Sequence, residues 1–362
     1  MRRIRAAVCH GFGEPLVVEE VRLRPPGPGE VEVALEAVAV CHSDISYADG
    51  AWGGDLPAVY GHEAAGRIAA VGPGVTGWRE GQAALVTLIR SCGGCGTCSG
   101  GAPVYCPTDL GLAPPLSTAE GGPLKAAMAC GAFAERVVVH ASQLAALPDD
   151  MPMEAACLLA CGVVTGVGAA VNTARVRPGE VVVVIGAGGV GLNAIQGARL
   201  AGAARVIAVD LSAEKLEAAR AFGATDGVLA GEPKPWRAAQ AAAGGRLADA
   251  VFVTVGAIPA YDKAPRYLAP QGRMVMVGMP HSGAMASYEP VVLAALGQGM
   301  VGSKMGDVVL ARDIPWMIDL WRQGRLKLEE LISGRWRLEE INAAIADTRA
   351  GAARRNVILL GR

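Results

Sequence analysis

Four cysteines crowd into a short, glycine-rich segment of the chain. Cys92, Cys95, Cys98 and Cys106 are separated by two, two and seven residues. The glycines between them permit sharp turns, so four thiolates can close around one tetrahedral zinc ion. Such a closed set has no open position for a substrate, which predicts a structural zinc that fixes a lobe with little apolar core. An iron–sulfur site or two disulfides are the alternatives.

A second motif is the run Gly186-Ala187-Gly188-Gly189-Val190-Gly191, which fits G-x-G-x-x-G. It follows a strand expected over residues 181–185 and opens a helix expected over 190–201. Its glycines permit a tight turn, close approach of the backbone to a pyrophosphate, and close packing of helix on strand. The amino end of the helix would face the phosphate charge. A glycine-rich loop without function is the alternative for an isolated motif.

Asp210 supplies the context that an isolated motif lacks. It closes the next expected strand, 19 residues after Gly191. A carboxylate at this position holds the ribose hydroxyls of NAD and repels the 2′-phosphate of NADP. The sequence therefore predicts a dinucleotide site that favours NAD.

The pattern of expected strands and helices changes twice along the chain, which indicates an inserted domain. The first 150 residues carry short β-like runs, at 31–35, 66–75 and 136–140, between Gly and Pro turns, and predict a twisted, partly open β-barrel. After about residue 162, strands alternate with helices, as in a doubly wound parallel sheet. A mixed pattern returns from about residue 303, with a helix at 313–323 and a closing strand at 356–360. The predicted domains are 1–162, 163–302 and 303–362.

Composition excludes several classes of partner. The chain has 33 Lys and Arg against 34 Asp and Glu, so nucleic acid or an anionic membrane is not its expected partner. No apolar signal segment follows the basic start. The longest uncharged stretch, residues 155–174, contains glycines, Asn172 and threonines, which favours a buried segment over a membrane span. We expect a soluble cytoplasmic protein whose cysteines bind metal.

Five motifs occur in the order typical of a known family: Cys41-His42-Ser43-Asp44, Gly61-His62-Glu63-Ala64-Ala65-Gly66, the cysteine quartet, Cys161-Gly162-Val163-Val164-Thr165-Gly166 and the glycine loop. The chain resembles the zinc-dependent alcohol dehydrogenases of the medium-chain dehydrogenase/reductase superfamily over nearly its whole length. The resemblance implies a GroES-like β-barrel catalytic domain with an inserted Rossmann domain. Residues 166–173 and the C-terminal part are most similar to thiol-adduct formaldehyde dehydrogenases and related bacterial primary-alcohol enzymes.

The resemblance also assigns residues that carry no local signature of a site. It implies a catalytic zinc held by Cys41, His62 and Cys161, with water or substrate as the fourth ligand. Two cysteines and one histidine are the known ligands of alcohol dehydrogenases, so this set follows from the resemblance and not from spacing. Glu63 would lie behind the metal as a possible alternate ligand. Asp44 would orient His62.

Further roles are implied in the same way. Ser43 would accept the alcohol proton. Trp52, Leu88 and Ala127 would line the substrate pocket, with core packing as the alternative for Trp52. Cys9, Cys130 and Cys157 are expected to be thiols that bind no metal. The cofactor-binding residues implied are His42, Thr165, Gly186, Gly188, Gly189, Val190, Gly191, Asp210, Lys215, Val277 and Arg355.

The expected activity is NAD-dependent oxidation of a primary or aryl alcohol to the aldehyde, and the reverse, with two zinc ions per chain. The alternative enzyme is a formaldehyde dehydrogenase acting on the S-hydroxymethyl adduct of a low-molecular-weight thiol. A binding protein without turnover is the alternative from another class. The family implies a homodimer or homotetramer, and the apolar segment 273–279 is a candidate subunit edge.

One position departs from the family pattern. Many members have a histidine five residues after the first zinc-ligand cysteine, where it ends a proton relay; this chain has Ser46. A serine is not a useful base near neutral pH. We therefore expect alcohol oxidation to be weak at pH 7 and to rise towards alkaline pH.

Overall fold

The computed structural model describes residues 1–351 and 353–361. They form two compact units. The first consists of Met1–Cys161, Val309–Trp321 and Lys327–Arg362, and the second of Gly162–Val308 and Arg322–Leu326. The chain therefore leaves the first unit, builds the second, and returns.

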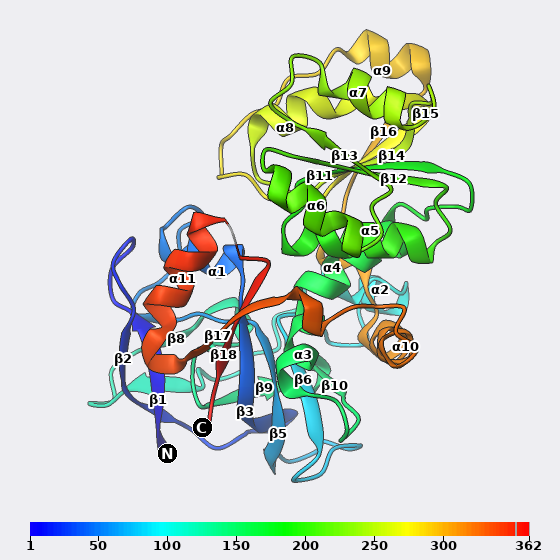
Figure 1. The fold of residues 1–362 in the computed structure, drawn as a ribbon. Coiled ribbons are helices and arrows are strands. Elements are labelled where there is room, and N and C mark those ends of the chain that lie inside the picture. Colours follow the sequence, from blue (N-terminus) through cyan, green and yellow to red (C-terminus); the bar gives the residue numbers. More distant parts are fainter. Residues whose placement is uncertain (352, 362) are drawn as a thin grey trace. The chain divides into compact units, whose positions relative to one another are not determined.

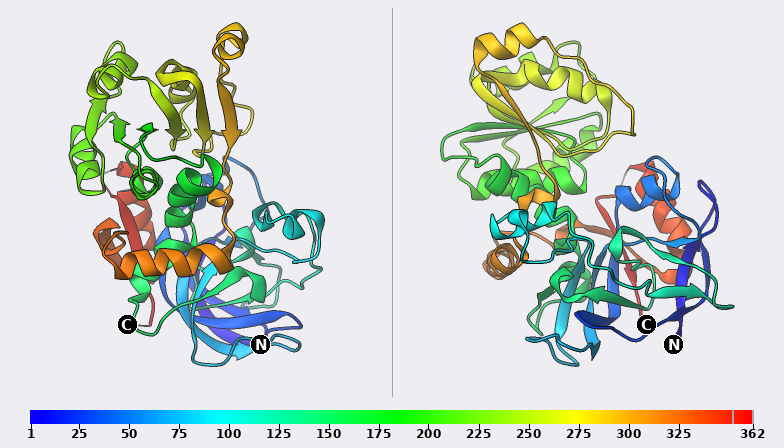
Figure 2. Two further views of the ribbon diagram at one scale, coloured as in Figure 1. Left: turned by 90° about the vertical axis from the view of Figure 1, so that its right-hand side faces the viewer. Right: turned by 180° about the vertical axis from the view of Figure 1, so that it is seen from behind.

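The first unit is mainly β-structure (Figure 2). Its strands pair mostly antiparallel in two sheets that share one apolar core. The five-stranded sheet has the order β7 (Leu116–Thr118), β2 (Val17–Leu23), β1 (Arg2–Cys9), β4 (Ala58–Val59), β8 (Lys125–Ala126). The other sheet has the order β10 (Leu144–Ala146), β6 (Ala83–Thr87), β5 (Glu63–Val71), β3 (Glu30–Val40), β18 (Arg355–Leu359), β17 (Ile332–Arg337), and β9 (Arg136–His140) also pairs with β3.

The last strand completes a sheet that the N-terminal segments begin. In β18, Asn356 lies opposite Val40 and Leu359 opposite Ala37 of β3. Figure 1 shows the red end of the chain beside the blue strand β3. This pairing confirms that the nucleotide-type fold is inserted between two parts of the β-rich fold.

The second unit is a six-stranded parallel sheet with helices on both faces (Figure 1). All five residues of β11 (Val181–Ile185) are buried, as expected for a strand covered on both faces. The strand order reverses at β11, where such sheets bind their ligands. The full order is β13 (Asp226–Leu229), β12 (Arg205–Asp210), β11, β14 (Ala248–Val253), β15 (Leu268–Met276), β16 (Gly299–Gly302).

Helices occupy the two faces of this sheet as the strand order requires. Figure 1 shows α5 (Gly189–Leu200) and α6 (Ala213–Ala221) on one face. It shows α7 (Pro235–Ala242) and α8 (Ile258–Lys263) on the other. Ser212 caps α6 by accepting the N–H of Lys215 at 3.2 Å.

Two expectations about strands are wrong. The strand expected over 66–75 ends at Val71, because Gly72 approaches the Gly27 carbonyl so closely that a Cβ would meet it at 2.0 Å. The segment 273–279 is not a sheet edge. Its strand, β15, lies between β14 and β16, so β16 forms the edge.

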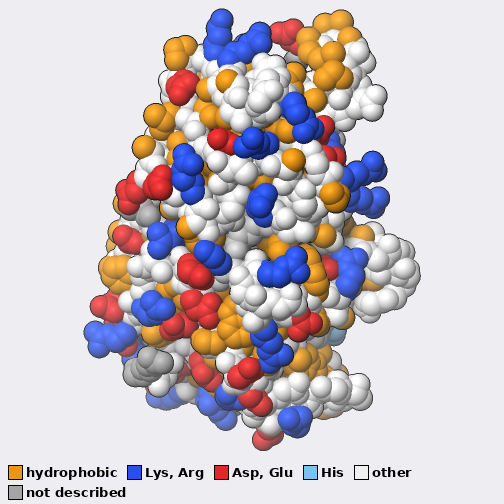
Figure 3. Space-filling view, turned by 45° about the vertical axis from the view of Figure 1, so that its right-hand side comes forward, with side chains coloured by type: hydrophobic (Ala, Val, Ile, Leu, Met, Phe, Trp, Pro, Cys, Tyr) orange, Lys and Arg blue, Asp and Glu red, His pale blue; other side chains and the backbone are white. Residues whose placement is uncertain are grey.

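No single helix in the described ranges is long and apolar enough to cross a membrane. The uncharged stretch is divided into Met153–Ala160 and Gly162–Thr173, a bent pair that reaches the required length and composition only together. On the face drawn in Figure 3, basic and acidic side chains are interspersed.

Candidate metal centres and cofactor loop

Four chemically active side chains converge in the interior of the first unit. Ligand atoms of Cys41, His62, Glu63 and Cys161 all lie within 4.8 Å of one another. His62 and Glu63 are completely buried, and the two cysteines are nearly so. The structure thus brings together the three predicted zinc ligands and the predicted alternate ligand.

The elements around this cluster fix each ligand. Cys41 follows β3 and caps α1 (His42–Ala48), and His62 immediately precedes β5. Gly61 has φ +90°, and a Cβ there would meet the Phe133 nitrogen at 2.5 Å, so only glycine fits before His62. Thr87 donates its hydroxyl to the Ala160 carbonyl at 2.7 Å, which holds the residue before Cys161.

One buried carboxylate orients two of the ligands. Asp44 accepts the N–H of Cys41 at 3.1 Å, the N–H of Gly61 at 2.9 Å, and Nδ1 of His62 at 2.9 Å. This bond assigns the histidine proton to Nδ1. Nε2 of His62 is buried and has no hydrogen-bond partner among the described residues. An orphaned imidazole nitrogen beside two thiols fits a bound zinc ion.

Hydrogen bonds, burial and neighbouring charges shift the pKa values of Cys41 and Glu63 in this cluster. The hydrogen bond between the two thiols holds the pKa of Cys41 well below its ordinary value, which favours the thiolate that zinc binds. Burial raises the pKa of Glu63 to about 7, and the Arg355 guanidinium opposes that rise. Arg355 forms a buried ion pair with Glu63.

This ion pair is the feature that sequence reasoning missed. The two residues lie 292 positions apart, on β5 and β18, and no local pattern links them. Only the pairing of β18 with β3 brings Arg355 to Glu63. The predicted contact of Arg355 with a cofactor phosphate stays a prediction.

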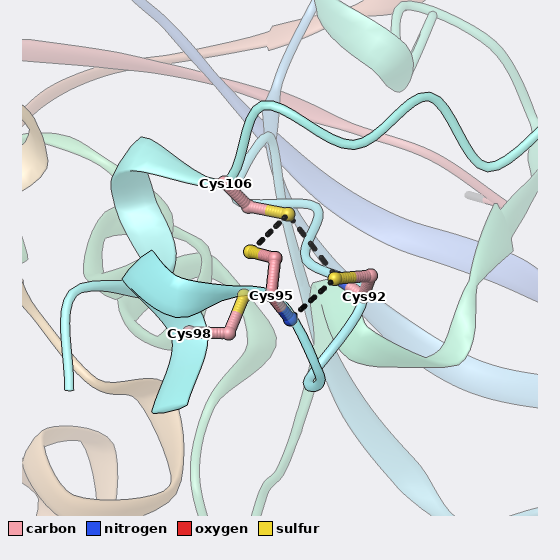
Figure 4. Close-up of side chains that lie close together, drawn as sticks. All are labelled: Cys92, Cys95, Cys98 and Cys106. Carbon is pink, nitrogen blue, oxygen red and sulfur yellow. Dashed lines mark hydrogen bonds between the residues drawn. The ribbon is translucent and has the colours of Figure 1, made fainter. Parts of the chain in front are cut away.

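The cysteine quartet forms the second cluster, and its sulfurs point toward one another (Figure 4). The Sγ atoms of Cys95 and Cys106 are 3.7 Å apart, and all four lie within 4.8 Å of one another. The short helix α2 (Gly96–Ser99) carries Cys98. Among residues 91–115 only Val104 is buried. A lobe with so little core fits a structural zinc that replaces one.

The glycine loop in the second unit has the predicted form. Gly186 has φ +98°, and a Cβ on Gly191 would meet the Gly186 carbonyl at 1.8 Å. Apart from its chain neighbours, no atom of the described residues lies within 4 Å of a Cβ built on Gly188, the N-cap of α5, so a phosphate has room there. Asp210 accepts the N–H of Ala187 at 2.7 Å, so its carboxylate lies against the loop. This arrangement fits a dinucleotide.

The remaining predicted cofactor residues are distributed over both units. In the second, Gly189 and Val190 lie in the first turn of α5, Lys215 in α6, and Val277 just after β15. Thr165, in α4 (Gly162–Gly168), places its hydroxyl 3.8 Å from the Met305 sulfur. In the first unit, His42 and Ser43 begin α1.

Trp52, Leu88 and Ala127 are all half-buried in the first unit. The Trp52 ring meets Tyr47 edge-on at 4.9 Å. Leu88 and Ala127 pack against the apolar core, together with Met128, a neighbour that the sequence did not indicate. Met128 has φ +49°, unusual for a residue with a side chain, which marks this turn as constrained.

Two sequence families match this chain. The alcohol dehydrogenase GroES-like domain matches residues 27–149, and the zinc-binding dehydrogenase family matches residues 189–323. A curated relative from Amycolatopsis methanolica, an NDMA-dependent alcohol dehydrogenase, is 34% identical and covers 99% of both chains. The chain is a zinc-dependent alcohol dehydrogenase by family. Alcohol oxidation at zinc, on small-molecule substrates, is the chemistry of this family.

Two further proteins are similar to this dehydrogenase over its full length. An S-(hydroxymethyl)glutathione dehydrogenase from Escherichia coli O1:K1 is 35% identical, with 98% of this chain and 99% of the relative covered. The crystal structure of a benzyl alcohol dehydrogenase from Acinetobacter calcoaceticus is 29% identical, covers all of both chains, and has a TM-score of 0.93. The dehydrogenase thus has the GroES-like and Rossmann-type folds that its sequence predicts.

Proposed function

We propose that the enzyme oxidises a primary or aryl alcohol to the aldehyde with NAD, and catalyses the reverse reaction. The convergence of Cys41, His62 and Cys161, with Nε2 of His62 left without a partner, carries this proposal. When bound, zinc supplies a Lewis acid for the alcohol oxygen and NAD supplies the hydride acceptor. Both zinc ions are needed: one in this buried site, and one in the cysteine quartet.

The residues of the chain prepare this site in three ways. The two thiolates neutralise a divalent ion, and Asp44 keeps the His62 proton on Nδ1, so Nε2 stays available as a ligand. Ser43 is proposed to take the alcohol proton. The buried Glu63, held by Arg355, is proposed to approach the metal during ligand exchange.

NAD is favoured over NADP because of Asp210. Its carboxylate accepts backbone N–H groups from Ala187 and Ser212, which holds the negative charge beside the loop. A 2′-phosphate would meet this charge. We assign cofactor binding to residues 163–302, and zinc and substrate chemistry to residues 1–162 and 303–362.

An aryl substrate is supported by the Trp52 ring and its Tyr47 neighbour, and by similarity to a benzyl alcohol dehydrogenase. The second candidate is oxidation of an S-hydroxymethyl thiol adduct, as the name of the Escherichia coli relative states for that protein. NAD reduction with formaldehyde alone, and with formaldehyde plus glutathione, separates the two. A thiol-dependent signal larger than that with benzyl alcohol would overturn the aryl assignment.

A homodimer is proposed from the edge of the parallel sheet. β16 pairs only with β15 among the described residues, and all four of its residues are exposed. The adjoining helix α9 (Pro290–Leu296) has no buried residue. Hydrophobic side chains gather at this end of the second unit (Figure 3). Pairing of β16 with a second copy would cover them; the sedimentation coefficient tests it. Thiolate ligands also favour a reducing cytoplasm as the location.

Asp210→Ser tests the cofactor assignment. Removing the carboxylate should weaken NAD binding and strengthen NADP binding, because the repulsion of the 2′-phosphate is lost. Cofactor dissociation constants, measured by NADH and NADPH fluorescence, give the result. A native enzyme that already prefers NADPH would contradict this role of Asp210.

A further inference from the structure

We propose that two threonine hydroxyls divide the cysteine quartet into a protected pair and an oxidisable pair. The oxidisable pair is Cys98 and Cys106. A hydroperoxide would join these two sulfurs and release the structural zinc, while the cysteines that face Thr97 and Thr108 remain reduced. This inference rests on the proposal that the quartet holds zinc.

Each protected cysteine has a hydroxyl beside its sulfur. Thr108 Oγ1 lies 3.3 Å from Sγ of Cys92 and is the donor of that bond. Thr97 Oγ1 lies 3.1 Å from Sγ of Cys95. A thiolate bound to zinc has no proton, so the Thr97 hydroxyl must also donate. Hydrogen bonds to an ionised acceptor are stronger than neutral ones, so both sulfurs lose electron density to a hydroxyl.

Once zinc has replaced the thiol protons, the other two sulfurs have backbone donors only. Cys106 Sγ accepts the N–H of Cys92 at 3.4 Å, and Cys98 accepts the N–H of Gly93. Within the described ranges, no hydroxyl bonds either sulfur. Backbone N–H groups also reach the protected pair: that of Cys95 lies 3.3 Å from Cys92 Sγ. The hydroxyls are therefore the difference between the pairs.

When zinc holds all four sulfurs as thiolates, a hydrogen-bond donor that stabilises one thiolate also lowers its nucleophilicity. The sulfurs without a hydroxyl donor should therefore attack a peroxide faster. All four cysteines are partly exposed, so an oxidant reaches the lobe. The sulfurs of Cys98 and Cys106, like every pair in the quartet, lie within 4.8 Å of each other, so proximity permits this disulfide but does not select it. Reactivity should therefore follow the hydroxyl pattern.

The reaction balances with a hydroperoxide as the oxidant. One thiolate attacks a peroxide oxygen, the O–O bond breaks, and a sulfenic acid and hydroxide form with hydrogen peroxide. The second thiolate attacks that sulfur, an S–S bond forms, and a second hydroxide leaves. Two electrons pass from the sulfurs to the peroxide. The zinc loses two of its four ligands and dissociates.

Native mass spectrometry and peptide mapping test the proposal with the full-length enzyme. No Lys or Arg lies between Arg90 and Lys125, so trypsin yields one peptide, residues 91–125, with all four cysteines. Cys41 and Cys161 fall in other peptides. Zinc per chain is counted before and during exposure to hydrogen peroxide, and fragmentation locates the first disulfide.

The variants are Thr97→Val and Thr108→Val, with Thr97→Ser as the rescue. Ser99→Ala is the matched control, because Ser99 donates its hydroxyl to the Cys95 carbonyl and not to a sulfur. In the wild type the first disulfide should join Cys98 and Cys106. Each valine variant should form disulfides in this peptide roughly three- to tenfold faster than the wild type. These disulfides should include the cysteine that has lost its hydroxyl donor, which is Cys95 in Thr97→Val and Cys92 in Thr108→Val.

Two results would overturn the proposal. One is a first wild-type disulfide that includes Cys92 or Cys95. The other is a valine variant that reacts at the Ser99→Ala rate while holding two zinc ions beforehand. A wild-type enzyme that carries no zinc in the quartet would instead contradict the metal assignment. The zinc count before peroxide therefore separates the two failures.

Discussion

The two metal centres are built in opposite ways. The quartet takes its ligands from one segment of 15 residues, and its cysteines are partly exposed. The buried centre takes Cys41, His62 and Cys161 from three separate elements, and its imidazole has no exposed surface. A centre made locally can stabilise a lobe without the rest of the fold. A centre made by the fold can be surrounded by chosen charges and shielded from water.

Their surroundings differ in the same sense. Hydroxyl and backbone N–H groups contact the quartet, whereas Asp44, Glu63 and Arg355 surround the buried ligands with charges. Charges act strongly at low dielectric, so the buried centre is suited to tune a reaction. The quartet is suited only to hold a shape. Changes in the two regions should therefore affect different measurements.

Cys161→Ala should have the largest effect on turnover. Losing a metal ligand should lower kcat by more than the roughly 10–100-fold that follows loss of an outer-shell partner. Steady-state kinetics and zinc content measure this, and circular dichroism with the melting temperature should show a folded chain that retains the zinc of the quartet. Near-normal activity would contradict the assigned ligand set.

Cys95→Ala should act on stability first. The variant should lose one zinc, because three thiolates no longer close the site. Structural zinc contributes about 10–16 kcal/mol in small peptides, of which only the share of this lobe would appear in the unfolding free energy. Zinc analysis, and limited proteolysis within residues 91–115, report the outcome. If the variant retained both zinc ions, the quartet would not be the structural zinc site.

Arg355→Met should lower the free energy of unfolding, because it removes the cation that faces the buried Glu63. Loss of the Arg355 guanidinium from beside the buried Glu63 carboxylate should destabilise the fold by about 3–5 kcal/mol. The folded-state pKa of Glu63, already about 7, should rise further, so the folded chain holds a proton that the unfolded chain releases above its usual 4.5. Stability should therefore fall as pH rises through 4.5 to beyond 7.

Urea unfolding at several pH values measures this effect, and the double variant with Glu63→Gln is the control. The glutamine removes the titrating carboxyl, so the double variant should recover stability at neutral pH and lose the pH dependence. If the unfolding free energy depended equally on pH in the single and double variants, the Glu63 carboxyl would not be the cause of the pH dependence.

Ser46→His should have the smallest effect and should concern the reaction alone. In the wild type, alcohol oxidation should be weak at pH 7 and climb toward pH 10, because no base ends the relay. Positioned general bases contribute about 10²–10⁴-fold, and a relay at a distance should contribute less. The variant should raise the rate at pH 7 modestly, with zinc content unchanged. A flat wild-type profile from pH 6 to 10 would falsify a limiting role for the missing histidine.

The sequence predicts the features built from one segment, and it does not predict those that depend on the pairing of distant strands. The quartet, the glycine loop and Asp210 show themselves by spacing, because their geometry is set within one segment or one strand–helix unit. Cys41, His62 and Cys161 came only from the family resemblance. The link between Glu63 and Arg355 escaped, because it depends on a strand pairing that no local pattern encodes. The edge position of β16 escaped because sheet order is not a local property either.

The return of β18 to β3 has a consequence for how the chain is made. A ribosome releases the N-terminal strands first, then the whole parallel-sheet unit, and only then the strand that carries Arg355. Until that moment β3 has no partner along the side that β18 later covers, and Glu63 lacks the Arg355 guanidinium. Unpaired strands of this kind attract other chains. The nascent enzyme is therefore most prone to aggregate while its nucleotide-type unit is already folding, and the interior around Glu63 closes only when β18 joins β3.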